Sequence, residues 1–158
     1  MPQSDGTLGP ALEFVFEAVV EVGAPVEIGQ TPSGRRRIIP ILGGRFEGPA
    51  VRGRVLAGGA DWQILHPDGA ADLDARYTLE TEKGSLIYVV NRGLRHGPPE
   101  VLQKLNAGQF ADPQTYYFRS SARFESGAAD CEWLARSIFI GVGQRYPEKV
   151  SIRFWRVA

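Results

Sequence analysis

The chain has 158 residues, of which 43% are hydrophobic and 23% charged, a composition typical of one globular domain with its own core. Its 18 basic and 18 acidic side chains balance, so no net charge draws it to nucleic acid or to an anionic membrane. No apolar run is long enough for a membrane helix, and residues 1–10 predict a flexible end rather than a signal peptide. We therefore predict a single cytoplasmic domain over residues 1–158, without nucleic-acid or membrane partners.

The few redox-active and metal-binding side chains predict no metal site and no cofactor. Cys131 is the only cysteine, which excludes an internal disulfide and is typical of a reducing compartment. Its neighbours Asp130 and Glu132 would raise the pKa of its thiol, so a structural role is favoured over a nucleophilic one. His66 and His96 lie in predicted loops, and no third histidine or second cysteine completes a zinc site with them.

The first part of the chain predicts strands joined by glycine-rich corners. Residues 12–22 alternate between apolar side chains and glutamates, which predicts a strand with one buried face. Residues 35–42 begin with three arginines and include Pro40. Because no further basic or aromatic residues follow the triplet, we interpret it as a solvated loop that enters an edge or bulged strand, and not as a nucleic-acid site. The glycines between residues 43 and 59 suit the corners of a curved sheet, and none opens a helix that would cradle a phosphate.

The second part contains the clearest hairpin and the one helix candidate. Residues 73–81 alternate strictly between apolar and polar side chains and are followed by a turn and an apolar run, which predicts a hairpin. Residues 98–108 predict a helix, because Pro99 suits its first turn and Gly108 can end it. Further strands are predicted over residues 50–56, 61–65, 115–124, 133–142 and 150–157.

A count of about eight or nine short strands with one short helix predicts an all-β domain. So many strands avoid exposed edges most simply by closing, so we predict a closed or nearly closed antiparallel β-barrel of about eight strands. A two-sheet β-sandwich is the alternative. Such a barrel has room for one small ligand, and the helix is expected to lie across one barrel mouth.

Several short motifs, taken in order, resemble the DUF3237 family, also called UPF0311. They are Ile39 to Pro49, Gly58 to Trp62, Asp68-Gly69, Leu73 to Leu79, Asn91 to Gly93, Tyr116 to Arg119 and Trp133-Leu134. The resemblance covers residues 12–157. It implies a small bacterial and fungal β-barrel, calycin-like or allene-oxide-cyclase-like in outline, with no established reaction and no agreed catalytic residues.

Asp61 and Arg76 are the first candidate site residues. A buried Asp61 would have a raised pKa, and a nearby arginine would lower it again, a balance that suits a general acid or base. The alternative is that Asp61 accepts backbone hydrogen bonds in its Gly-Gly turn. A hairpin centred on residues 67–71 would place Asp61 opposite Arg76 inside the barrel. The alternative for Arg76 is a solvent-facing ladder with Asp74 and Glu80.

The remaining candidates would complete a polar and aromatic pocket. If Arg76 and Arg119 both point inward, the cavity should bind an anionic or oxygen-rich small molecule, although Arg123 on the same face favours solvent for Arg119. Tyr117 is a candidate proton donor. The predicted ligand-binding residues are Trp62, Glu80, Asn91, Arg119 and Trp133, with the tryptophans expected mainly in the core.

These residues predict a small-molecule-binding barrel, with enzyme activity left open. One hypothesis is a cofactor-independent isomerase, cyclase or lyase for a small carbonyl- or carboxylate-containing metabolite. Asp61 would move a proton, and Arg76, helped by Tyr117 or Arg119, would stabilise the oxyanion. The alternatives are a carrier of a small hydrophobic ligand and an interaction module with a filled barrel. The near-zero net charge also permits a homodimer or a larger assembly.

Overall fold

A computed structural model of the chain describes residues 8–158. Residues 1–7 of the predicted flexible end lie outside this range, and residues 8–10 are exposed and without regular structure. The strands are β1 (Leu12–Val22), β2 (Val26–Thr31), β3 (Gly34–Glu47), β4 (Arg52–Val55), β5 (Ala60–Leu65), β6 (Ala71–Thr81), β7 (Leu86–His96), β8 (Tyr117–Glu125), β9 (Ile138–Arg145) and β10 (Lys149–Val157). The helical elements are α1 (Pro99–Asn106) and the 3-10 segments η1 (Pro113–Thr115) and η2 (Ala129–Arg136). No helix in the described range is long and apolar enough to cross a membrane.

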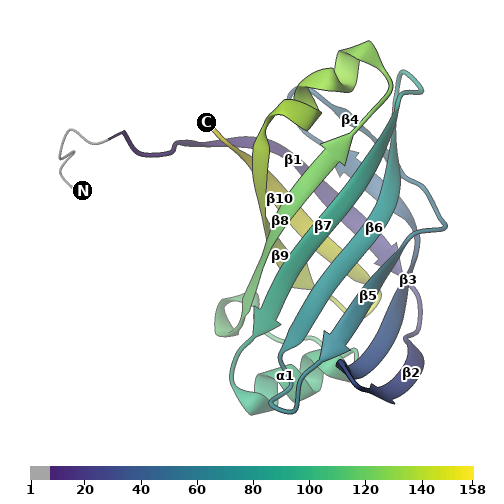
Figure 1. Ribbon diagram of the computed structural model, residues 1–158, viewed down its shortest axis with the longest axis vertical. Helices are drawn as coiled ribbons and strands as arrows, with labels where there is room; N and C mark the ends of the chain where they lie inside the picture. Colours follow the sequence, from purple (N-terminus) through teal and green to yellow (C-terminus); the bar gives the residue numbers. More distant parts are fainter. Residues whose placement is uncertain (1–7) are drawn as a thin grey trace.

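The strands form a closed eight-stranded antiparallel barrel, as predicted (Figure 1). Closure comes from β1, which pairs with β10 on one side and with β3 on the other. The short strands β4 and β5 occupy one position together, because both pair with β3 and with β6. β2 forms a hairpin with β3 outside the ring. A sandwich is excluded because pairing runs without a break around the whole ring.

The close approach of β3 to β1 depends on Gly44. Its φ is +136°, a conformation that favours glycine, and a Cβ there would overlap the carbonyl oxygen of Val19. This contact allows the long strand β3 to bend across the barrel and meet β1, β4 and β5 in turn. The prediction of curved-sheet corners in this glycine-rich stretch is confirmed here.

One half of the barrel interior is filled by phenylalanines. Ring centroids within this cluster lie between 4.9 and 5.5 Å apart, in the tilted and edge-to-face arrangements that aromatic pairs prefer. The members are Phe16, Phe46, Phe124, Phe139 and Phe154. The segment η2 packs Cys131 and Leu134 onto the same core. None of these five rings lines the cavity in the other half of the barrel.

The other end of the barrel is covered by α1 (Figure 1). Leu102 and Leu105 are buried in a second apolar cluster with Leu73 and Phe118, which come from the barrel wall. The prediction that the helix lies across one mouth is therefore confirmed. Between α1 and the phenylalanine cluster lies a cavity that aliphatic and polar side chains line together.

Candidate functional site

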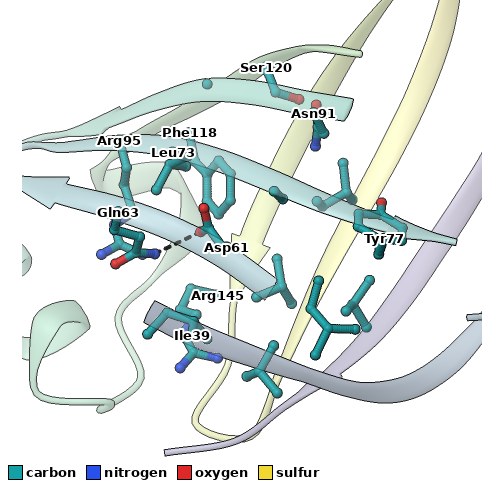
Figure 2. Close-up of a pocket in the computed structure, with 17 residues that line it drawn as sticks. Ile39, Asp61, Gln63, Leu73, Tyr77, Asn91, Arg95, Phe118, Ser120 and Arg145 are labelled. Atoms are coloured by element: carbon teal, nitrogen blue, oxygen red, sulfur yellow. Dashed lines mark hydrogen bonds between the residues drawn. The ribbon is translucent and has the colours of Figure 1, made fainter. Parts of the chain in front are cut away.

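The open half of the barrel encloses a cavity. Its volume is about 50 Å³, counted as the space open to the centres of water-sized molecules, which is room for a few waters or the polar part of a small ligand. Aliphatic side chains form much of its lining, and polar side chains from β5, β6, β7, β8 and β9 complete it (Figure 2). A wider cleft of about 700 Å³ lies outside this end, beside α1, and shares Val22 and Arg145 with the cavity.

Three buried arginines stand at the α1 end of the cavity. Arg37 on β3, Arg95 on β7 and Arg145 on β9 are 4%, 2% and 7% exposed. Each occupies an inward position of its strand, because side chains on a strand alternate between the two faces. Arg95 follows Asn91 and Gly93 on the inner face of β7, which places its guanidinium beside α1.

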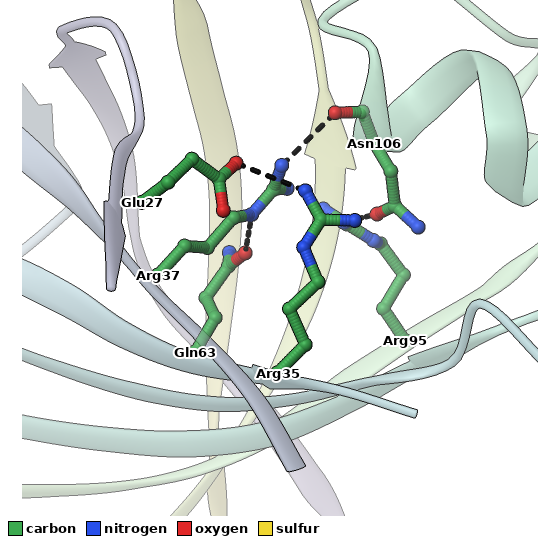
Figure 3. A network of polar contacts seen from close by, with 6 residues as sticks. All are labelled: Glu27, Arg35, Arg37, Gln63, Arg95 and Asn106. Atoms are coloured by element: carbon green, nitrogen blue, oxygen red, sulfur yellow. Dashed lines mark hydrogen bonds and ion pairs between the residues drawn. The ribbon is translucent and has the colours of Figure 1, made fainter. Parts of the chain in front are cut away.

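The guanidiniums are bonded mainly to neutral groups (Figure 3). Arg37 donates from Nε to Gln63 Oε1 at 2.8 Å and from Nη1 to the carbonyl oxygen of Asn106 at 2.9 Å. Arg95 donates from Nη2 to Asn106 Oδ1 at 2.7 Å, while its Nε has no partner. Arg145 reaches only the carbonyl oxygen of Lys149, at 3.4 Å. Among residues 8–158, none of the three arginines forms an ion pair with a carboxylate.

Asp61 on β5 is the acidic group of the cavity wall. Its Oδ2 accepts a hydrogen bond from Gln63 Nε2 at 2.8 Å, and its Oδ1 accepts one from the backbone N–H of Asp74 at 2.9 Å. Burial raises the pKa of Asp61, and these two hydrogen bonds and the charge of Arg95 oppose the rise without cancelling it. Asp61 therefore lines the cavity, the inward position that its expected convergence with Arg76 required. The alternative role, acceptance of a backbone hydrogen bond, also holds for one oxygen, but the donor lies on β6 and not in the Gly-Gly turn.

The arginines give the cavity an excess of positive charge. Burial, together with the charges of Arg37 and Arg145, lowers the pKa of Arg95 to about 10. Burial also lowers the pKa of Arg37 and of Arg145. The cavity wall therefore holds two arginines, Arg95 and Arg145, and the single carboxyl of Asp61, while Arg37 adds a third buried guanidinium in the adjoining cleft. Such a site is suited to a ligand carboxylate or another oxyanion.

A second group of polar atoms in the cavity wall is neutral and unsatisfied. The hydroxyl of Tyr77, the amide oxygen Asn91 Oδ1 and the hydroxyl of Ser120 have no hydrogen-bond partner among the described residues. Burial raises the pKa of Tyr77, with a smaller contribution from the charge of Asp61, so this phenol is neutral at physiological pH. An unsatisfied buried polar group costs about 1–3 kcal/mol, and a bound ligand or water is the usual explanation.

Arg76 does not lie inside the barrel, and the predicted convergence with Asp61 is wrong. The observed register pairs Asp61 with Ala75 and Ala60 with Arg76, one residue away from the predicted one. The cause is the length of the loop over residues 66–70. This loop pairs Leu65 with Ala71 and so sets the register of β5 against β6. Arg76 Nε instead contacts Asp74 Oδ1 at 3.3 Å on the outer face, so the alternative, a surface ladder, holds for Asp74. Glu80, its other expected member, pairs with Arg54.

Five other predicted residues also lie outside the cavity. Trp62 and Tyr117 are 40% and 44% exposed, so the prediction that they line the same cavity as Asp61 is wrong. Alternation explains this, because the neighbours Gln63 and Phe118 take the inward positions. The other three are Arg119, Glu80 and Trp133. The guanidinium of Arg119 lies over the ring of Tyr117, Glu80 pairs with Arg54, and Trp133 lies on η2. Of the predicted set, only Asp61 and Asn91 line the cavity.

Sequence reasoning missed most of the polar lining. Arg37 was assigned to a solvated loop, whereas β3 already begins at Gly34 and directs Arg37 inward. Strict alternation was the available signal: Arg37 is in phase with the apolar Ile39 and Ile41, just as Tyr77 is in phase with Leu79. The missed residues of the cavity wall are Gln63, Tyr77, Arg95, Ser120 and Arg145. Arg37, also missed, lines the cleft beside α1 and bonds to Gln63.

Comparisons with known proteins agree with the barrel and assign no reaction. The family model described as "Protein of unknown function (DUF3237)" matches residues 10–157. A UPF0311 protein of Rhodopseudomonas palustris (strain TIE-1) is 43% identical over 145 residues, which cover 90% of this chain and 95% of that protein. The crystal structure of a conserved protein of unknown function from Rhodopseudomonas palustris has a TM-score of 0.91 at 39% identity, covering 96% of this chain and 100% of that chain. A structure described as an enzyme from Penicillium herquei has a TM-score of 0.71 at 21% identity, covering 96% and 97% of the two chains, and shares the fold.

Proposed function

We propose, on the premise that this chain belongs to the DUF3237 family of unknown function, that its barrel binds a small organic acid and transfers a proton on it without a cofactor. One observation carries the proposal. Three buried arginines lie at the α1 end of the barrel, and none of them forms an ion pair among residues 8–158. Arg95 and Arg145 line the cavity, whose one carboxyl group is Asp61, and Arg37 lines the adjoining cleft. A buried charge without a partner costs several kcal/mol, and a bound anion would offset that cost.

The ligand's acidic group would occupy the arginine end of the cavity. A guanidinium binds a carboxylate through two parallel hydrogen bonds, and Arg95 has its Nε free for such a contact. Arg145 makes only a long hydrogen bond to a backbone carbonyl, so it too can turn to an anion. The aliphatic wall formed by Ile39, Ile41 and Ile152 would cover the carbon skeleton of the ligand.

Asp61 is the group suited to proton transfer. Its raised pKa brings the carboxyl nearer to neutrality, and the hydrogen bond from Gln63 fixes its orientation. As a carboxylate it would take a proton from the carbon next to a carbonyl, and the electron pair of the C–H bond would move onto the carbonyl oxygen. The guanidiniums would stabilise the resulting enolate. In an acid whose enolate is conjugated with a carbon–carbon double bond, return of the proton to the far end of that double bond would shift the double bond and complete an isomerisation.

A non-catalytic carrier of the same acid is the second candidate, favoured by the mainly aliphatic wall. It needs the arginines but makes no use of Asp61 as a base. The likeness to the Penicillium herquei enzyme concerns the fold and does not decide between the two.

The test measures binding first and proton transfer second. Calorimetry with a panel of small carboxylic and oxo-carboxylic acids should give binding that Arg95→Leu abolishes, while Arg92→Leu on the outer face of the same strand leaves it unchanged. Proton NMR in D₂O should then show exchange of the C–H next to the carbonyl of a bound acid, lost in Asp61→Asn with binding retained. Binding that ignores Arg95→Leu would overturn the proposal, and binding without exchange would favour the carrier.

A further inference from the structure

The neutral polar atoms of the cavity point to a more specific ligand, an inference that rests on the proposed function. We propose that Tyr77, Asn91 and Ser120 form a second subsite that binds a hydroxyl group, so that the ligand is a hydroxy acid rather than a simple carboxylic acid. The acid group would lie among the arginines and the hydroxyl at the other end of the same cavity.

The burial of these side chains supports a ligand rather than solvent as their partner. Tyr77 and Asn91 are each only 4% exposed, and both line the cavity. Tyr77 and Ser120 offer hydroxyls, and Asn91 Oδ1 offers an acceptor, all without partners among residues 8–158. A ligand hydroxyl fits the three because it accepts a hydrogen bond from a hydroxyl and donates one to the amide oxygen.

The two subsites are separated along β7. Arg95 and Asn91 occupy inward positions four residues apart. Ser120 is paired with Gly93 at the middle of this interval, roughly 7 Å along the strand from Arg95, a distance that a four-carbon hydroxy acid spans. Gly93 lies between Arg95 and Asn91 in the cavity wall and contributes no side chain, so the space from one subsite to the other stays open. Figure 2 shows Arg95 and Tyr77 on opposite sides of the cavity. A ligand that reaches both groups therefore carries its two oxygen functions on different ends.

Asp61 lies beside the neutral subsite. It pairs with Ala75 on β6, and Ala75 pairs with Asn91 on β7, so Asp61 and Asn91 lie at the same level of the barrel. Tyr77 is the next inward residue after Ala75, and the charge of Asp61 acts on it. A hydroxyl bound here would hold its own carbon, and the C–H bonds next to it, within the region that Asp61 faces.

The space for the Ser120 hydroxyl is provided by Gly141 on β9. A Cβ at Gly141 would overlap Ser120 Oγ, so any other residue there would displace or block that hydroxyl. The barrel therefore keeps an unpartnered hydroxyl in its interior next to a residue with no side chain. Apolar packing alone would fill this position instead.

The experiment compares acids that differ by one hydroxyl. Binding of butyrate, 2-hydroxybutyrate, 3-hydroxybutyrate and 4-hydroxybutyrate is measured by calorimetry on the full chain. We expect one hydroxybutyrate to bind at least about tenfold more tightly than butyrate, because a site built to bind a hydroxyl discriminates against the analogue that lacks it. Ser120→Ala and Tyr77→Phe should reduce this ratio towards one without weakening butyrate, whereas Ser121→Ala on the outer face should change neither.

The outcomes separate the two proposals. If the acids bind through Arg95 but every hydroxybutyrate binds like butyrate in the wild type, waters alone satisfy the three atoms and the hydroxyl subsite is wrong, while the proposed function stands. If no acid binds, or if Arg95→Leu has no effect on binding, both proposals are wrong. A preference that persists in Ser120→Ala and in Tyr77→Phe would also overturn the subsite.

Discussion

Replacement of Arg95 by leucine should remove ligand binding without destabilising the fold. Arg95 is 2% exposed, and its guanidinium makes one side-chain hydrogen bond, to Asn106 Oδ1. A hydrogen bond that involves a charged group is worth about 1.5–3 kcal/mol. Burial of an unpaired charge costs several kcal/mol. The substitution therefore loses the energy of the hydrogen bond but also removes the cost of the buried charge, and these two effects on the free energy of unfolding oppose each other. A buried leucine also gains about 1.5–3 kcal/mol from the hydrophobic effect.

The expected result for Arg95→Leu is a free energy of unfolding equal to that of the wild type or higher by up to about 3 kcal/mol. Urea denaturation of the ligand-free protein measures it. The matched control is Arg92→Leu, which removes an exposed arginine 3.6 Å from Asp74 Oδ1 on the same strand and should change the free energy by less than about 1 kcal/mol. A loss of about 3–5 kcal/mol in Arg95→Leu would refute the reasoning, because that is the effect of breaking a buried ion pair. Arg95 would then be stabilised by a carboxylate, and the cavity would hold no excess positive charge.

Three further predictions test other parts of the structure. Burial raises the pKa of Asp61 in the folded state, so the folded protein binds the proton of this carboxyl more tightly than the unfolded chain does. The free energy of unfolding should therefore fall as the pH rises from about 4 through the folded-state pKa. Asp61→Asn should remove this fall in urea titrations at a series of pH values, and an unchanged pH profile would contradict the assignment. Asn106→Ala should destabilise the closed end by about 1–3 kcal/mol, because Arg95 loses its hydrogen-bond acceptor. Hydrogen exchange of the backbone amides in α1 should become faster. Unchanged exchange would show that α1 is held by apolar packing alone. Arg76→Ala should change the free energy of unfolding by less than about 1 kcal/mol, because the contact of Arg76 with Asp74 is on the surface. A larger loss would indicate that Arg76 forms a buried pair with Asp61, contrary to the observed register.

The barrel, its strands and its closing helix could be predicted from local patterns. Residues 12–22 and 73–81 alternate so clearly that each could only be a strand with one buried face, and Pro99 and Gly108 bounded the helix. The number of predicted strands then indicated a closed barrel, since a closed sheet has no exposed edge strand. The position of Asp61 beside the cavity was also within reach, because an acidic residue in a short apolar strand has few other roles.

Only the tertiary structure decided which polar residues meet inside the barrel. The hairpin register depends on the loop over residues 66–70, and a shift of one residue moved Arg76 to the outer face. Arg37, Arg95 and Arg145 come from strands far apart in the sequence and are neighbours only because the ring closes around them. The sequence alone determined the alternation of inward and outward side chains within each strand. The phase of that alternation relative to the cavity, and hence the charge of the site, was determined by closure and register, which depend on contacts between distant residues.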